Sequence, residues 1–207
     1  MVDCEDLLDF WFGADLESPA AVEGLVAKWF GGGPEFDREI AEHFGALPER
    51  ALRGELARWE KAPRTSLALV IALDQLPRNL YRSSSRSYEF DPLALEKALG
   101  AIERGFDSRL HPLEATFLYL PLEHAEDLAL QERCVGHFTR LVERAPAATC
   151  YCYEGFVDYA CSHRDVVREF GRFPHRNAPL GRSSTPEERA YLAGGGTTFG
   201  ASDAGAG

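Results

Sequence analysis

The stretch Leu67-Ala68-Leu69-Val70-Ile71-Ala72-Leu73 is apolar at every position and runs directly into the polar stretch Asp74-Gln75-Leu76-Pro77-Arg78-Asn79-Leu80-Tyr81-Arg82. A helix without a polar face is stable only where other helices surround it. The first stretch therefore predicts the central helix of a helical protein, and the second predicts charged side chains at the end of its core.

Helical periodicity continues from this stretch in both directions, and neither period-2 alternation nor Asn-Gly or Asp-Gly hairpin turns indicate strands. The pattern predicts an all-α fold in which antiparallel helical hairpins stack as a compact superhelix or bundle. We expect a single domain over residues 1–193 and a disordered Gly- and Ala-rich tail over residues 194–207. The predicted helices cover residues 3–12, 19–30, 35–45, 47–61, 65–76, 92–104, 112–119, 123–145, 149–171 and 186–193.

Prolines mark where these helices are expected to begin, end or bend. Ser18-Pro19, Asp91-Pro92 and Thr185-Pro186 each combine an N-cap residue type with Pro at the first helical position. Pro77 and Pro121 interrupt helical patterns, so we expect a boundary or a kink at each.

The composition excludes several classes of function. The chain carries 22 Lys plus Arg against 33 Asp plus Glu, a formal net charge of -11, which repels nucleic-acid phosphates. Its first residues, Met1-Val2-Asp3-Cys4-Glu5-Asp6, are acidic where a secretory signal would be basic and then apolar. No apolar stretch approaches the roughly 20 residues of a membrane span. We therefore expect a cytoplasmic protein with neither nucleic-acid nor membrane partners.

The common catalytic and metal-binding signatures do not occur. The sequence contains no Gly-x-Ser-x-Gly, no Walker A loop, no dinucleotide fingerprint and no Cys-x-x-Cys. Its five cysteines are odd in number and irregularly spaced, which favours reduced thiols. The sequence therefore names no cofactor and assigns no metal ligands.

The first Arg-Asn segment, residues 73–82, ends the most apolar helix of the chain. Guanidinium groups contact carboxylates and phosphates with two hydrogen bonds, and Asn both donates and accepts. We expect this segment to contribute ligand-binding side chains at Asp74, Arg78, Asn79 and Arg82. The alternative is that Asp74 pairs internally with Arg78 or Arg82 and only ties two helices together.

The second Arg-Asn segment, residues 172–182, has a related composition and two prolines, which indicate an ordered loop. If the two segments meet, their arginines form a locally positive site that attracts a small anion despite the net charge. The candidate ligand-binding residues here are Arg172, His175, Arg176, Asn177 and Arg182. An ordinary network with Asp74, Glu123 and Asp127 would use the same side chains.

The acidic segment, Glu123-His124-Ala125-Glu126-Asp127, contains the candidate catalytic residues. On the predicted helix Glu123, Asp127 and Gln131 form one stripe that we expect to face inward, whereas Glu126 falls on a solvated outer face. Carboxylates beside a neutral imidazole suit acid–base catalysis. We add His163 to Glu123, His124 and Asp127 because it lies on the apolar stripe of its helix; the alternative is a hydrogen-bonded core histidine.

Several long motifs occur in order along the chain: Phe10-Trp11-Phe12-Gly13, Leu73 to Arg82, Asp91-Pro92-Leu93-Ala94-Leu95, Phe117 to Arg133, and Gly171 to Arg182 followed by Ser184-Thr185-Pro186-Glu187-Glu188. Together they resemble the bacterial DUF924 family, whose function is unknown. The resemblance covers residues 10–192. It implies an all-α, tetratricopeptide-like fold and no established activity. Ala125 stands where the family pattern suggests Ser, so no hydroxyl is available beside His124.

Two functional hypotheses follow. The first is that the two Arg-Asn segments and the acidic segment build a polar cleft for a small anionic or polar ligand, with or without catalysis. The second is a tetratricopeptide-like interaction module that binds a protein or peptide without catalysis. A ligand site requires the segments to meet with Arg groups left partly unpaired, whereas a set of locally closed salt bridges would argue against it.

Overall fold

The computed structural model describes residues 2–82 and 84–199, and within these ranges the protein is all-α. This confirms the predicted fold class, whereas the tetratricopeptide-like detail stays a prediction. The α-helices are α1 (Cys4–Phe12), α2 (Pro19–Gly31), α3 (Gly33–Phe44), α4 (Leu47–Leu52), α5 (Pro63–Leu80), α6 (Asp91–Glu103), α7 (Pro112–Glu123), α8 (Leu128–Arg144), α9 (Cys150–Phe170) and α10 (Pro186–Ala193). Short 3-10 helices are η1 (Ala57–Lys61), η2 (Ser85–Tyr88), η3 (Asp107–Arg109) and η4 (Pro174–Arg176).

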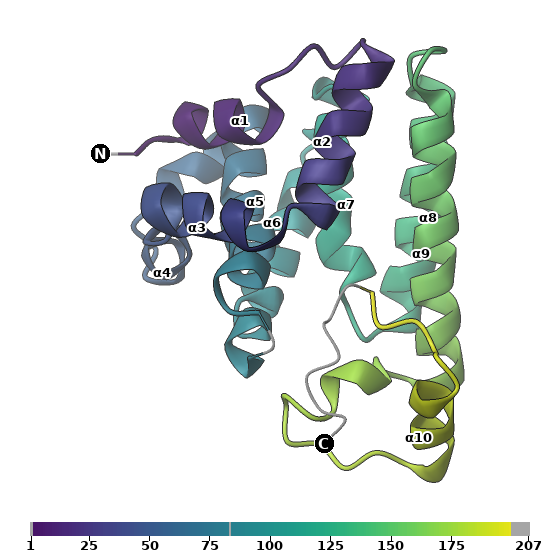
Figure 1. The fold of residues 1–207 in the computed structure, drawn as a ribbon. Helices are drawn as coiled ribbons and strands as arrows, with labels where there is room; N and C mark the ends of the chain where they lie inside the picture. Colours follow the sequence, from purple (N-terminus) through teal and green to yellow (C-terminus); the bar gives the residue numbers. More distant parts are fainter. Residues whose placement is uncertain (1, 83, 200–207) are drawn as a thin grey trace.

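Helix α5 is the centre of the core. Every residue from Leu67 to Leu73 is at most 3% exposed, because α5 contacts α1, α3, α4, α6 and α7. Figure 1 shows these helices around α5 on one side of the molecule, with α8 and α9 on the other. The apolar stretch therefore occupies the position that its sequence predicts.

A cluster of aromatic rings joins the amino-terminal helices to α7. Trp29 donates from Nε1 to the backbone carbonyl of Trp11 at 3.0 Å. The ring of Phe117 lies edge-on to Trp29, with 4.7 Å between centroids, and to Phe12, with 5.3 Å. Edge-to-face pairs add about 0.5–1.5 kcal/mol beyond burial, so α1 and α2 are fixed against α7.

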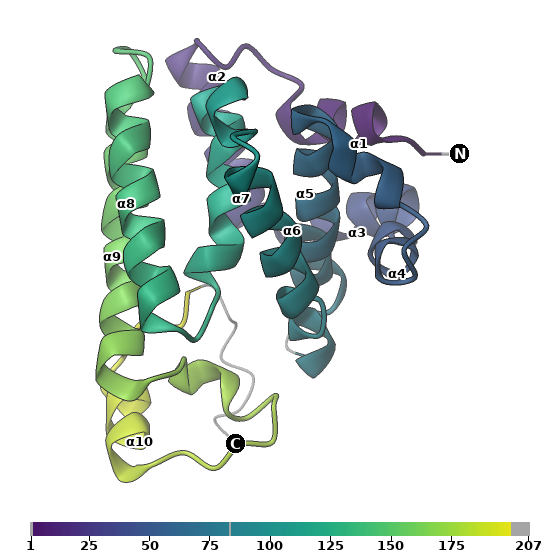
Figure 2. The same cartoon turned by 180° about the vertical axis from the view of Figure 1, so that it is seen from behind.

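Helices α8 and α9 form a long antiparallel hairpin (Figures 1 and 2). Within this hairpin, α8 packs against α7. At the end of this hairpin opposite its connecting turn, the chain continues through η4 into α10. The second Arg-Asn segment therefore lies near the carboxyl-terminal end of α7. None of the described helices combines the length and apolarity needed to cross a bilayer.

Two predicted helix ends were wrong because tertiary packing outweighs proline. Pro77 and Pro121 lie inside α5 and α7, which continue to Leu80 and Glu123. Each proline lacks the N–H of one helical hydrogen bond, and neither ends its helix. Leu76 and Leu122 beside them are buried, and their packing keeps the chain helical. These two extra turns bring the polar residues to the end of the core.

Two other predicted helices are interrupted. Residues 47–61 divide into α4 and η1, with Gly54 at a φ of 75° between them; this left-handed conformation ends a helix. The predicted helix over residues 123–145 begins only at Leu128. Residues 124–127 therefore form a connection between α7 and α8, and the helical stripe assumed for them does not apply.

The tail was expected to be disordered over residues 194–207. Residues 200–207 lie outside the described residues. Within 194–199, however, Phe199 packs against the small apolar cluster of Val166, Val167 and Phe173. The part of the tail that is described thus ends in a packed aromatic ring.

The core position of α5 predicts a large cost for truncating Ile71, which is fully buried. Ile71→Ala should lower the free energy of unfolding by about 2–5 kcal/mol, because it removes buried methylene groups and leaves a cavity. Leu52→Ala is the control, since Leu52 is 51% exposed and should change stability by no more than about 0.5 kcal/mol. Urea unfolding measures both; equal effects would contradict the central place of α5.

Candidate functional site

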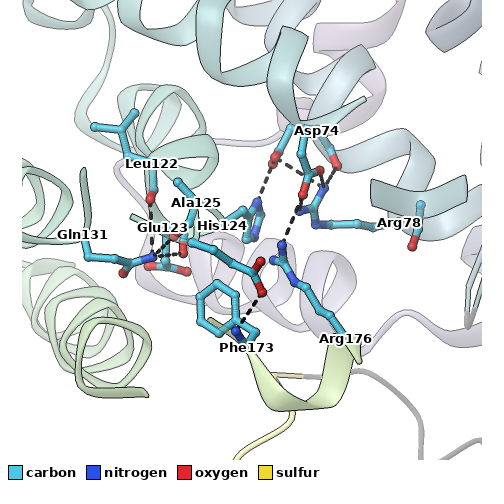
Figure 3. A network of polar contacts seen from close by, with 12 residues as sticks. Asp74, Arg78, Leu122, Glu123, His124, Ala125, Gln131, Phe173 and Arg176 are labelled. Carbon is cyan, nitrogen blue, oxygen red and sulfur yellow. Dashed lines mark hydrogen bonds and ion pairs between the residues drawn. The ribbon is translucent and has the colours of Figure 1, made fainter. Parts of the chain in front are cut away.

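Asp74 is the centre of a polar network at the carboxyl-terminal ends of α5 and α7 (Figure 3). Its carboxylate is fully buried, lies 2.8 Å from His124 Nδ1 through Oδ1, and accepts from Gln75 Nε2 at 2.6 Å through Oδ2. Burial alone would raise the pKa of Asp74, but the charge of Arg78 and the contact with His124 lower it to about 2. Asp74 is therefore an ionised carboxylate inside the protein.

His124 is held in one tautomer by this contact. A carboxylate only accepts hydrogen bonds, so the proton of the ring is on Nδ1 and the lone pair is on Nε2. Burial and the charge of Arg78 lower the pKa of His124 despite Asp74. The ring is thus a neutral imidazole at pH 7. Its side chain is 14% exposed, and Nε2 makes no hydrogen bond to any residue of the described ranges.

Glu123 is the opposite case, a carboxyl group kept neutral. It is 2% exposed, and burial together with the charge of Asp74 raises its pKa to about 8. Its Oε1 lies 3.6 Å from Nδ1 of His163, a ring nitrogen that donates to the backbone carbonyl of Tyr159 at 3.0 Å. Burial lowers the pKa of His163 to about 2. Glu123 and His163 are therefore both uncharged at neutral pH.

The two Arg-Asn segments meet at Asp91, the first residue of α6. Arg78 donates to both carboxylate oxygens of Asp91, at 2.9 and 3.2 Å. Arg176 of η4 lies 3.4 Å from Oδ2 of the same carboxylate. Figure 3 shows Arg78 of α5 and Arg176 of η4 on the same side of the network as His124. The carboxylate of Asp91 therefore binds the two arginines. The Asp-Pro pair had predicted that it would cap the helix instead.

Arg176 is the least satisfied of the five candidate arginines. It is 7% exposed, and its guanidinium lies over the rings of Tyr88 and Phe173, 4.8 and 4.6 Å from their centroids. Its only ion pair within the described residues is the long contact with Asp91, and its Nε has no hydrogen-bond partner there. Asn177 Oδ1 and His175 Nδ1, beside it in the chain, are also buried without a partner.

The other residues of the first Arg-Asn segment are closed in local pairs. Arg82 donates to both oxygens of Asp37 on α3, at 2.5 and 2.8 Å, and Asn79 donates to the same carboxylate at 2.8 Å. These contacts tie α5 to α3. Arg82 and Asn79 are therefore paired with α3, separately from the network around Asp74.

The second Arg-Asn segment is tied down in the same way. Arg172 donates to both oxygens of Glu188 on α10, at 2.6 and 2.8 Å, and Asn177 donates to that carboxylate at 3.0 Å. Arg182 donates to both oxygens of Glu126, at 2.6 and 2.9 Å. Arg172 and Arg182 therefore fix the loop, whereas Arg176 projects from it into the network.

One assignment within the acidic segment was wrong. Asp127 was expected to face inward, but it is exposed and caps α8 by accepting from Leu130 N at 3.0 Å, because α8 begins later than predicted. Glu126 is exposed as expected, and it also pairs with Arg182 and accepts from the backbone N–H of Phe173 at 2.8 Å. Glu123 and Gln131 are buried as predicted.

Comparisons with known proteins identify the family. The family model described as bacterial protein of unknown function (DUF924) matches residues 7–196. The chain belongs to the DUF924 family. It is similar to the solved structure of the protein of unknown function ATU0120 from Agrobacterium tumefaciens, with 38% identity, a TM-score of 0.76, and coverage of 91% of this chain and 96% of that one. No curated protein matches the chain.

Three residues of this DUF924 protein contribute to the site region without having been selected from the sequence. Asp91 joins the two Arg-Asn segments, Glu188 holds Arg172 and Asn177, and Phe199 packs against His163 with 3.5 Å between ring centroids. Asp91 and Glu188 stand in the motifs that carry the family resemblance, which was the available signal. Nothing in the sequence around Phe199 indicated its place.

The arrangement combines a neutral base, a neutral acid and a buried cation. Environments that push the pKa values of neighbouring groups apart are typical of acid–base sites. Within residues 2–82 and 84–199, no group of three or more His, Cys, Asp or Glu side chains is arranged to hold a metal ion. These protonation states suit proton transfer, and a guanidinium suits contact with an anionic group.

The raised pKa of Glu123 predicts a pH-dependent stability. Between the ordinary carboxyl range near 4.5 and the folded value of about 8, the folded state of this DUF924 protein binds more protons than the unfolded state. Its stability therefore falls as the pH rises through this range, by up to about 1.4 kcal/mol per pH unit from this group. The Gln side chain of Glu123→Gln cannot ionise. As the pH rises, the free energy of unfolding of this variant relative to that of the parent should therefore increase by up to this amount per pH unit.

Urea unfolding at pH 5, 6 and 7 measures the difference. Glu154→Gln is the matched control, because Glu154 is an exposed residue of α9 and its substitution should give a small, constant difference. A constant difference between Glu123→Gln and the parent across this pH range would contradict a neutral Glu123.

Proposed function

We propose that this DUF924 protein binds a small anionic or polar molecule at Arg176 and that His124 and Glu123 transfer protons to and from it. The observation that carries the proposal is the buried guanidinium of Arg176, whose Nε has no hydrogen-bond partner among the described residues. Leaving a buried polar group unsatisfied costs about 1–3 kcal/mol, and more for a charged one. An anionic group of a ligand supplies the missing acceptor.

The roles within the site follow from protonation states. His124 presents a lone pair on Nε2 because Asp74 fixes the proton on Nδ1, so it acts as the base. Glu123 keeps its proton at neutral pH and acts as the acid. A positioned acid or base contributes roughly 10²–10⁴-fold to a rate. Ala125 offers no hydroxyl next to His124, so the proposed reaction class is proton transfer or activation of water, without a serine nucleophile.

The proposed site is smaller than the sequence suggested. Four of the five candidate arginines have ion pairs of 2.9 Å or less, and we assign Arg82, Arg172 and Arg182 to holding the loop and helices in place. Arg78 positions Asp74 and Asp91. Asp127 and Asn79 have structural roles in the proposal. The net charge of -11 repels the phosphates of a nucleic acid, which supports a small anion as the ligand. We also propose that the protein is cytoplasmic.

A thermal-shift screen tests the proposal with inorganic phosphate, sulfate, acetate and succinate as probes. At ten times its dissociation constant, a probe that binds the folded state adds about 1.4 kcal/mol, which raises the Tm by about 3–6 °C. The shift should be lost in Arg176→Gln. It should persist in the control Arg168→Gln. Arg168 is an exposed residue of α9 that pairs with Glu132 of α8.

Two results would contradict the proposal. The first is an equal shift in the parent and in Arg176→Gln, provided that the variant unfolds cooperatively without a probe. The second is the absence of a shift with every probe, which would favour the alternative of an interaction module without catalysis.

A further inference from the structure

Phe199 occupies a box of four aromatic rings, Tyr159, His163, Phe173 and His175. Its ring is stacked on His163 with 3.5 Å between centroids and an interplanar angle of 24°. The other three rings stand across it at 5.6–5.8 Å, with interplanar angles of 62–89°. Offset-stacked and edge-to-face contacts of this kind enclose a planar ring on several sides. We call Tyr159, His163, Phe173 and His175 the aromatic box.

The backbone of Phe199 is strained, and three glycines lie shortly before it in the chain. Its φ of 52° makes it the one non-glycine residue with a positive φ in the described part of the chain, a conformation that disfavours a bulky side chain. It follows Gly194-Gly195-Gly196-Thr197-Thr198, in which the backbone carbonyl of Thr197 accepts from the hydroxyl of Tyr191 at 3.3 Å. The contacts of the ring act together with this attachment and offset the unfavourable φ of Phe199.

The aromatic box shares its walls with the candidate site. His163 lies 3.6 Å from the carboxyl group of Glu123, and its ring centroid is 6.4 Å from that of His124. Phe173 forms the other shared wall, with the guanidinium of Arg176 at 4.6 Å from its centroid. A planar ring held in the box would therefore carry a substituent near Arg176, whose only ion pair in the described residues is the long one with Asp91, and near the base His124.

We propose that the aromatic box is the subsite for the planar ring of an aryl-bearing anion, such as an aromatic carboxylate, and that Phe199 is its intramolecular occupant. This inference rests on the proposed function, because Arg176 receives the anionic substituent. The ligand ring takes the place of Phe199 against His163, and the tail leaves the box when the ligand binds. The substrate class is thereby narrowed from any small anion to an anion with an aromatic ring.

Binding of benzoate and acetate, measured by calorimetry, separates the ring from the charge. Benzoate should bind the parent more tightly than acetate does. Phe199→Ala should tighten benzoate, because an occupant that fills the box in about nine-tenths of the molecules weakens the apparent affinity about tenfold. Acetate should bind the variant and the parent equally. Phe199→Tyr, which retains a ring, should remain close to the parent.

Phe30→Ala is the matched control, since Phe30 is 54% exposed on α2 and is not one of the rings around Phe199. It should leave both affinities unchanged. If benzoate binds no better than acetate, or if Phe199→Ala leaves benzoate unchanged or weakens it, the box is only an anchor for the tail and the inference is wrong. In that outcome acetate binding still supports the proposed function. If neither anion binds, the inference is wrong, and the proposed function is decided separately by the thermal-shift screen with phosphate, sulfate and succinate.

Discussion

The structure depends on one buried charge, the carboxylate of Asp74 at the end of the central helix. A carboxylate in the core is stable only when positive charge and hydrogen-bond donors surround it, and here they come from three residues. Gln75 and Arg78 belong to α5 itself, and His124 comes from the end of α7. Meeting the requirements of Asp74 thus fixes where α7 ends relative to α5 and which tautomer His124 adopts.

The charge of Asp74 also sets the state of its neighbours. It raises the pKa of Glu123, which burial has already raised, so one carboxyl group is ionised and the other neutral in the same region. Arg78 balances Asp74 on one side and binds Asp91 on the other. Asp91 then meets Arg176 at a longer distance. The buried positive charge that remains least compensated is therefore that of Arg176, at the boundary between the acid–base pair and the aromatic box.

The fold could be predicted further than the site. The apolar run before Asp74 identified the central helix, and the inward positions of Glu123 and Gln131 were confirmed. Predictions failed where local rules met tertiary contacts: Pro77 and Pro121 did not end their helices, and the late start of α8 made Asp127 a cap. The pairing of the exposed Glu126 with Arg182 was not predicted either. The sequence left open whether the two Arg-Asn segments meet. In the structure they meet at Asp91, and no local pattern shows that Asp91 faces two arginines. Phe199 carried no signal, because its place depends on rings from α9 and the loop after it.

The most direct test of this account is the protonation of His124, measured by long-range ¹H–¹⁵N NMR of the six histidine rings between pH 5 and 8. The His124 signals are assigned with His124→Gln. The account predicts that His124 gains its charge at a lower pH than an exposed histidine, because burial and the charge of Arg78 lower its pKa. It also predicts that the neutral ring carries its proton on Nδ1, because Asp74 accepts a hydrogen bond there, and that Asp74→Asn weakens this tautomer preference. A ring that carries its proton on Nε2, or that becomes charged near pH 6.5 as an exposed histidine does, would contradict it.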